Sequence, residues 1–207
     1  MNERIALNVS LTLIGPVLTQ TSSAPAYGVD APMAKSRDGR YYLPGTLVKG
    51  RLRQAWEELH DILEITNNDI EKHLGSKSGN RQDGAAVASG RGAMQFSDFL
   101  TPSGTANRNQ YRIRMDEARG AVATGAYLVI EAPFEPGEEV TFCGTISFFA
   151  GSDEIQRIGK LIEAGLKWNL SFGAERTIGF GRLKEIAIIE SAGKKNADPP
   201  LIMKDFL

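Results

Sequence analysis

The sequence has few residues that would crosslink the chain or carry it into a membrane. Cys143 is the single cysteine among 207 residues, so the chain can form no internal disulfide and no zinc site built from cysteines. No apolar run approaches the roughly 18 residues of a membrane helix, and the N-terminus lacks the apolar core of a signal peptide. We therefore expect a cytoplasmic protein with no membrane partner.

The sequence also lacks an excess of charge of either sign. The chain has 24 lysines and arginines against 25 acidic residues, which gives a formal net charge of −1. This balance excludes a polycation that holds nucleic acid by bulk charge, so any nucleic-acid site must be a local patch. Hydrophobic residues make up 42% of the sequence, which is enough to build a core.

Hydrophobic spacing predicts an α+β fold. The expected strands cover residues 3–14, 93–98, 111–115, 126–132, 139–148 and 182–190. One helix is expected to start with Thr46 as its N-cap and to carry an apolar stripe as far as Leu63, and another is expected from Ser152. This order is typical of a ferredoxin-like (RRM-like) core, here with a long insertion after the first strand.

Two segments fall outside this pattern. Residues 75–92 are rich in glycine and polar residues, and we expect them to form a mobile insertion. Residues 191–207 are expected to form a C-terminal tail.

A basic stretch spans residues 30–53, which carry six basic residues against two acidic ones. Lys49, Arg51 and Arg53 lie in its predicted helix, and Lys49 and Arg53 share a face because they are four residues apart. Both lie in the N-terminal half of the helix, where backbone amides favour anions, so a phosphate backbone could lie there. A solvated basic face explains the same pattern.

A glycine-rich segment covers residues 173–183. Gly179 and Gly181 allow the backbone to approach a ligand closely and expose its amides. Arg176 and Arg182 could then bind phosphates. The alternative is an ordinary turn before a strand.

Two more arginines, Arg112 and Arg114, lie in a segment with few large apolar residues. This segment, at about residues 111–126, is expected to be an exposed hairpin that returns to the core near Tyr127. It either binds RNA or is a solvated hairpin with no special role.

Asp30 is the candidate for chemistry. It lies in a loop between Gly28 and Pro32, and near a phosphodiester its carboxylate could coordinate a divalent metal or position an attacking hydroxyl. The alternative is a turn residue. His60 and His73 fall in no recognisable nucleophile or metal arrangement.

Four segments, in the same order, resemble the RAMP superfamily of CRISPR proteins, and most closely the repeated backbone subunit of type III effector complexes. They are residues 27–56 with the helix motif PGTLVKGRLR, residues 89–99, residues 112–142 and residues 173–183. The resemblance implies a single RAMP-type domain over residues 1–207, with a thumb-like extension at about 111–126.

The resemblance also implies a function. Such a subunit binds guide RNA (crRNA), which pairs with target RNA, and it contacts other subunits of the effector complex, including further copies of itself. In cutting members an aspartate of the first loop is required for cutting target RNA with a divalent metal, expected to be Mg²⁺ or Mn²⁺, and Asp30 occupies that position. The residues that match guide-binding positions are Lys49, Arg53, Arg176, Gly179 and Gly181.

Three functions remain open within this family. The chain could be a backbone subunit that cuts target RNA, a non-catalytic subunit of the same complex, or a guide-processing endoribonuclease. The last often uses a histidine near the first helix, and His60 lies late in that helix. The helix motif departs mildly from the family pattern, because Thr46-Leu47-Val48 stands where two serines and a leucine are usual.

Overall fold

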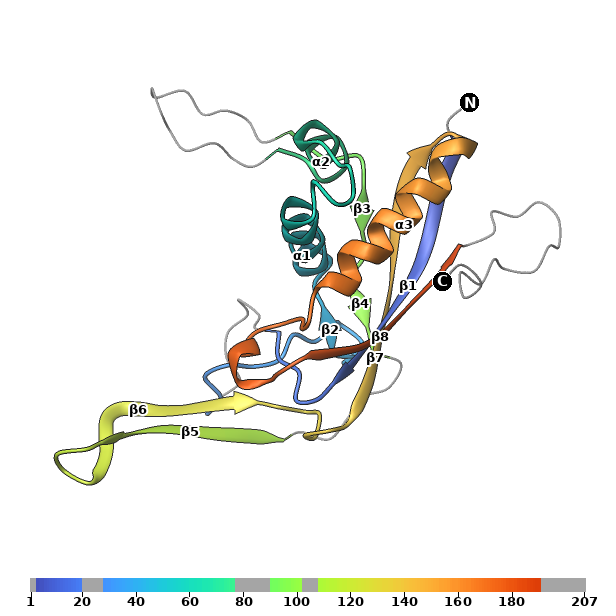
Figure 1. Ribbon diagram of the computed structural model, residues 1–207. Coiled ribbons are helices and arrows are strands. Elements are labelled where there is room, and N and C mark those ends of the chain that lie inside the picture. The colour runs from blue at the N-terminus through green and yellow to red at the C-terminus, as the bar shows by residue number, and fades with distance from the viewer. Residues whose placement is uncertain (1–2, 20–27, 77–89, 102–107, 191–207) are drawn as a thin grey trace.

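The computed structural model describes residues 3–19, 28–76, 90–101 and 108–190 (Figure 1). The helices are α1 (Gly45–Glu58), α2 (Asn67–Leu74) and α3 (Ser152–Trp168), and a short 3₁₀ turn covers Arg176–Ile178. The strands are β1 (Glu3–Ile14), β2 (Tyr42–Leu43), β3 (Gln95–Phe96), β4 (Phe99–Leu100), β5 (Asn109–Asp116), β6 (Ala121–Glu131), β7 (Glu139–Ala150) and β8 (Arg182–Glu190).

The main sheet has the strand order β2-β4-β7-β1-β8, and β3 also pairs with β7. β1 is antiparallel to β7 along its whole length, from Glu3 opposite Ala150 to Ile14 opposite Glu139. On its other edge β1 is antiparallel to β8. The chain order strand, helix, strand, strand, helix, strand, with the last strand beside the first, is that of the ferredoxin-like core. The α+β fold predicted from the sequence is therefore confirmed.

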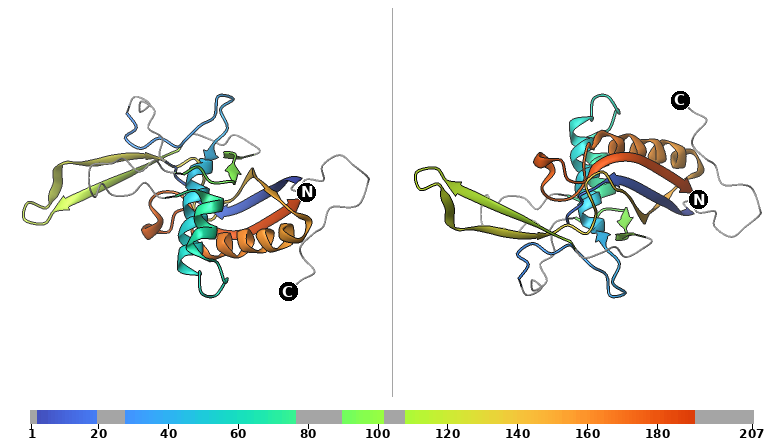
Figure 2. Two further views of the ribbon diagram at one scale, coloured as in Figure 1. Left: turned by 90° about the horizontal axis from the view of Figure 1, so that it is seen from above. Right: turned by 90° about the horizontal axis from the view of Figure 1, so that it is seen from below.

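The helices cover one face of this sheet (Figures 1 and 2). Every second residue in most of β1 is buried, including Leu7, Val9 and Leu11. α1 and α3 pack against each other around the buried Trp56, whose indole N–H donates to the carbonyl of Leu161 at 2.8 Å. The alternation of apolar residues in β1 thus provides the surface on which both helices pack.

The first helix is shorter than its apolar stripe predicts. α1 ends at Glu58, the chain turns with Glu64 in the left-handed region (φ 51°), and α2 begins after Thr66. Thr66 Oγ1 accepts from the amide of Asp69 at 3.1 Å, and the Asp69 carboxylate accepts from the Thr66 amide at 3.1 Å. This capping box starts a new helix. Because α1 already ends at Glu58, the prediction that the first helix continues to Leu63 is wrong.

The start of α1 also differs from the prediction. Pro44, not Thr46, occupies the N-cap position, and its side chain makes no capping bond. The amide of Gly45 instead donates to the carboxylate Oδ1 of Asp98 at 2.9 Å. This partner lies just before β4, far along the chain, so no local sequence signal could reveal it.

β5 and β6 form a two-stranded hairpin that extends away from the main sheet (Figures 1 and 2). Its register runs from Asn109 opposite Glu131 to Asp116 opposite Ala121. The segment expected to be an exposed hairpin lies within these strands. Its exposed apolar side chains are Tyr111, Ile113, Met115, Val122, Tyr127 and Leu128.

Parts of two other expected segments lie outside the described residues. These parts are residues 77–89 of the expected insertion and the expected tail at 191–207. No helix among the described residues is both long and apolar enough to cross a membrane.

Candidate functional site

Asp30 is exposed, on a loop that runs beside the base of the hairpin. Ala31 forms a parallel bridge with Ile130 of β6. The amides of Asp30 and Ala31 both donate to the carbonyl of Val129, at 2.9 and 3.1 Å. The Asp30 carboxylate oxygen Oδ2 accepts from the amide of Val129 at 2.7 Å. These bonds fix both the backbone and the carboxylate of Asp30 against β6.

Glu131 lies behind this loop and is only 7% exposed. Its Oε2 accepts from the amide of Met33 at 3.0 Å. Its Oε1 accepts from the hydroxyl of Tyr41 at 3.0 Å and pairs with Nζ of Lys35 at 2.6 Å. Glu131 is not among the residues predicted from the sequence, where its one signal is an acidic residue inside the otherwise apolar run LVIEAPF.

This network changes the proton affinity of two side chains that contact Glu131. Burial lowers the pKa of Lys35, but hydrogen bonds to Glu131 and Tyr41 outweigh burial, so its pKa lies above the ordinary value. The pKa of Tyr41 is also raised, first by burial and then by its hydrogen bond to Glu131. At neutral pH, therefore, Lys35 stays charged and Tyr41 keeps the proton that it donates.

The described residues of this chain offer no resident site for the predicted divalent metal. Among the described residues, no group of three or more His, Cys, Asp or Glu side chains is placed to hold one. One carboxylate oxygen of Asp30 is engaged by the backbone of β6. The oxygens of Glu131 already accept bonds from three donors. Mg²⁺ requires a near-octahedral set of oxygens, which these two side chains do not supply.

The basic residues of α1 differ in their contacts. Nη2 of Arg53 donates to the carbonyl of Leu74 at 2.7 Å and to that of Gly75, at the C-terminus of α2. Arg51 is half-buried and donates to a neighbouring glutamine at 2.7 Å. Lys49 is half-buried. Arg53 is thus engaged by carbonyls of the chain itself, which leaves Arg51 and Lys49 as the better placed candidates for binding phosphate.

The N-terminus of α1 is less suited to a phosphate than the sequence indicates. The carboxylate of Asp98 accepts from the amide of Gly45 at 2.9 Å and puts a negative charge at this helix end. Like charges repel, so this carboxylate disfavours a phosphate at the same amides.

Two glycines of the glycine-rich loop, Gly179 and Gly181, differ in how closely other atoms pack against them. The amide of Gly181 donates to the carbonyl of Pro16 at 2.7 Å, and a Cβ at Gly181 would overlap the carbonyl oxygen of Phe172. Gly179 has φ 93°, and nothing among the described residues beyond its chain neighbours lies within 4 Å of the position of a Cβ. Gly181 is therefore required for packing, whereas Gly179 leaves room for a ligand beside the backbone.

An ion pair joins this loop to the hairpin. Arg112 of β5 pairs with Glu175, which precedes the 3₁₀ turn in a left-handed conformation (φ 56°). Arg176 and Arg182 of the loop are exposed. Arg114 also lies in β5, but its side chain is outside the part of the chain that the structure describes. The fold thus brings together two segments whose paired residues lie 63 residues apart in the sequence.

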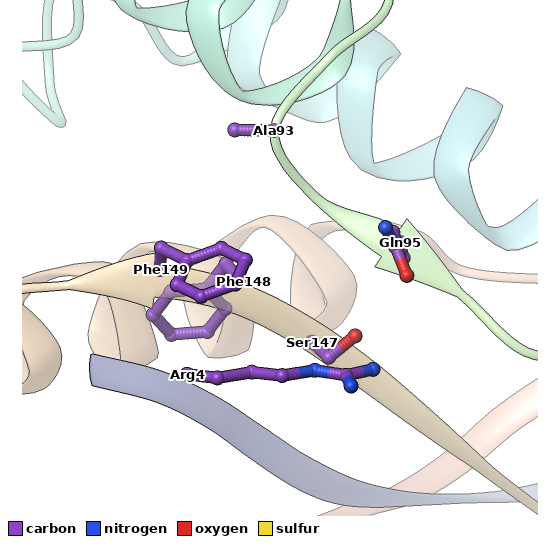
Figure 3. A pocket seen from close by; sticks show the side chains of 6 residues that line it. All are labelled: Arg4, Ala93, Gln95, Ser147, Phe148 and Phe149. Atoms are coloured by element: carbon purple, nitrogen blue, oxygen red, sulfur yellow. The ribbon is translucent and has the colours of Figure 1, made fainter. Parts of the chain in front are cut away.

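A small pocket lies beside the start of β1 and the end of β7 (Figure 3). Its lining contains no carboxylate, histidine or cysteine, so we assign no acid–base chemistry to it. The lining residues are Arg4, Ala93, Gln95, Ser147, Phe148 and Phe149.

Residues 10–184 match the family model of the RAMP superfamily. The chain belongs to the RAMP superfamily. The family predicted from the sequence is therefore confirmed. Comparison of this RAMP-superfamily chain with curated proteins found no match.

The fold of this RAMP-superfamily chain is similar to that of a solved chain. That chain comes from the cryo-EM structure of the Type III-B Cmr-beta bound to cognate target RNA, and the similarity has a TM-score of 0.61. The two chains are 16% identical, and the match covers 90% of this chain but 61% of the other. At this identity the likeness concerns the fold alone.

Proposed function

We propose that this RAMP-superfamily chain is a guide-RNA-binding subunit of a type III CRISPR effector complex, and that Asp30 serves the cutting of target RNA. Family membership and the likeness to a chain of a Cmr complex support the assembly. One observation carries the catalytic part. Asp30 presents an exposed carboxylate that is held in place at the base of a projecting hairpin.

The proposed guide contact needs no base recognition by the protein. In RNA-guided complexes base pairing reads the sequence, and the protein binds the backbone and shape of the duplex. Lys49, Arg51, Arg176 and Arg182 would supply local positive charge, and Gly179 would allow close approach of the RNA backbone. This arrangement is compatible with a net charge of −1.

The proposed reaction uses the nucleophile that RNA itself carries, the 2′-hydroxyl. Asp30 accepts the proton of this hydroxyl while the 2′-oxygen of the RNA bonds to the adjacent phosphorus. The bond from phosphorus to the 5′-oxygen breaks, and that oxygen takes a proton from water. The products are a 2′,3′-cyclic phosphate and a 5′-hydroxyl. Since Val129 holds Oδ2, the other oxygen, Oδ1, is the one assigned to the proton.

The requirement for Mg²⁺ or Mn²⁺ stays a prediction for the assembled complex. In the part of this subunit that the structure describes, the side chains form no site for a divalent ion by themselves. Oxygens of the RNA or of other subunits would have to complete one. The cytoplasm as its compartment likewise remains a prediction.

The test replaces Asp30 by alanine in the effector complex purified with its guide RNA. We expect cutting at the sites of this subunit to fall by about 100-fold or more, while affinity for target RNA changes by less than about twofold. The matched control is Asp38→Asn, because Asp38 is an exposed carboxylate of the same basic stretch and pairs with Arg40 at 2.6 Å. Cutting is measured with and without a chelator.

The second candidate is a non-catalytic subunit of the same complex. The bond from Val129 to Asp30 favours it, because a carboxylate that accepts from a nearby backbone amide can serve the loop alone. Unchanged cutting in the Asp30→Ala complex would select this function. No observation favours guide processing by His60, which is exposed after α1 with Nε2 at 3.2 Å from the Asp61 carboxylate.

A further inference from the structure

The loop that carries Asp30 is attached to the hairpin by an isolated parallel bridge. Ala31 bridges Ile130 in parallel orientation. The carbonyl of Val129 accepts hydrogen bonds from two amides of the loop. The amide of Glu131 donates to the carbonyl of Ala31 at 2.9 Å. The position of the Asp30 backbone is therefore set by the base of β6.

Behind this attachment, one carboxylate holds both arms of the loop that runs from Ala31 to Tyr41. Met33 and Lys35 lie on the outgoing arm, and Tyr41 lies on the returning arm, where it bridges Lys35 in antiparallel orientation. Glu131 accepts from all three. A buried carboxylate is stable only when donors satisfy it, and here each donor comes from the same loop.

We infer that Glu131 is a positioning residue for Asp30. Glu131 is buried and so does not reach RNA, whereas Asp30 is exposed. Glu131 acts through the amide of Met33 and the side chains of Lys35 and Tyr41, which keep the loop against β6. This inference rests on the proposed role of Asp30 in cutting.

The first measurement concerns the loop itself and uses the isolated chain. Glu131→Gln keeps the size of the side chain but removes its charge, and so weakens its bonds to Lys35 and Met33. We expect hydrogen exchange at the amides of Ala31, Met33 and Ala34 to become roughly five- to tenfold faster, as the loss of about one hydrogen bond implies. The control is Asp69→Asn, a carboxylate-to-amide change in the capping box of α2. Unchanged exchange in the Glu131→Gln chain would overturn the inference.

The second measurement concerns cutting in the complex with its guide RNA. We expect Glu131→Gln to slow cutting at saturating target RNA by roughly 10- to 100-fold, because a small displacement of a reacting group has effects of this size. The affinity for target RNA should stay within about twofold of the unchanged complex. In the Asp30→Ala background, Glu131→Gln should have no further effect on cutting. Loss of guide loading or of target affinity in proportion to cutting would show a general structural role and would overturn the inference.

Tyr41→Phe provides a milder variant in case Glu131→Gln does not fold. It removes one donor to Glu131 but keeps the buried ring that packs edge-on against Phe134. We expect a smaller loss of cutting in the same direction, and an unchanged rate would count against the inference. If Asp30→Ala stops cutting while Glu131→Gln does not slow it, only the role of Glu131 is refuted. If Asp30→Ala leaves cutting unchanged, the proposed function falls, and the role of Glu131 falls with it.

Discussion

His73 is a buried titratable side chain that the proposed function does not use. It lies in α2, and its ring packs edge-on against Trp56 with 6.2 Å between the ring centroids. Its Nδ1 has no hydrogen-bond partner among the described residues. Burial, followed by the charge of Lys72, lowers the pKa of His73 below its ordinary value. The folded protein therefore holds His73 neutral at neutral pH.

This lowered pKa predicts a pH dependence of stability. The unfolded chain, in which histidine has a pKa of about 6.5, binds a proton more readily than the folded chain. Stability is therefore present above this pH and is lost as the pH falls below it. We expect His73→Phe, which keeps an aromatic ring beside Trp56, to flatten the fall in melting temperature between pH 7.5 and 5.5. His60→Ala, a change at the exposed histidine, is the control. A wild-type pH slope in the His73→Phe chain would contradict this prediction.

At the scale of elements, the hairpin and the glycine-rich loop are joined by the pair Arg112–Glu175. Both side chains are partly exposed, so the pair is expected to contribute no more than about 1 kcal/mol to stability. Under the proposed function, RNA would offer Arg112 a second partner. A phosphate would compete with Glu175 for the same guanidinium.

This competition is tested by the salt dependence of RNA binding in the complex. If Arg112 binds phosphate, Arg112→Ala should reduce the slope of log affinity against log salt by about 0.7, the value for one contact with a single strand. Glu175→Gln frees Arg112 and should tighten binding, because RNA no longer displaces a carboxylate. Arg157→Ala, on α3, is the matched control. Equal slopes in the Arg112→Ala and unchanged complexes would mean that Arg112 serves only the fold.

At the scale of the whole molecule, a nearly neutral chain can bind RNA only where basic residues gather. The structure separates the three basic residues of α1, because Arg53 is engaged by the end of α2. Lys49 and Arg51 are therefore the ones whose loss should affect RNA and leave the fold intact.

We expect the double change Lys49→Ala and Arg51→Ala to lower the affinity for guide RNA and to reduce the salt slope by about 1.4, twice the value for one contact with a single strand. The melting temperature should hardly change, because both side chains are partly exposed and such charges contribute little to stability. Lys72→Ala, a lysine on α2, is the control for loss of charge. An unchanged slope would identify the α1 patch as a solvated basic face.

Periodicity in the sequence was sufficient for most of the fold. Alternation in residues 3–14 and 139–148 predicted β1 and β7, and helical spacing predicted α1 and α3, because these signals depend on neighbouring residues. The break between α1 and α2 was missed because the apolar spacing continues through Leu63, although Thr66 and Asp69 carry a local capping signal.

The sequence by itself determined the order of the main elements β1, α1, β7, α3 and β8, the family and the presence of Asp30 in its loop. Only the tertiary structure decided which partners the site residues contact. Glu131 lies behind the Asp30 loop, Asp98 binds the start of α1, and Pro16 and Phe172 surround Gly181. The physical reason is that Glu131, Asp98 and Pro16 are distant in the chain from the residues that they contact. Hydrophobic periodicity reports which face of an element is buried, but not which hydrogen-bond partner a distant segment brings to it.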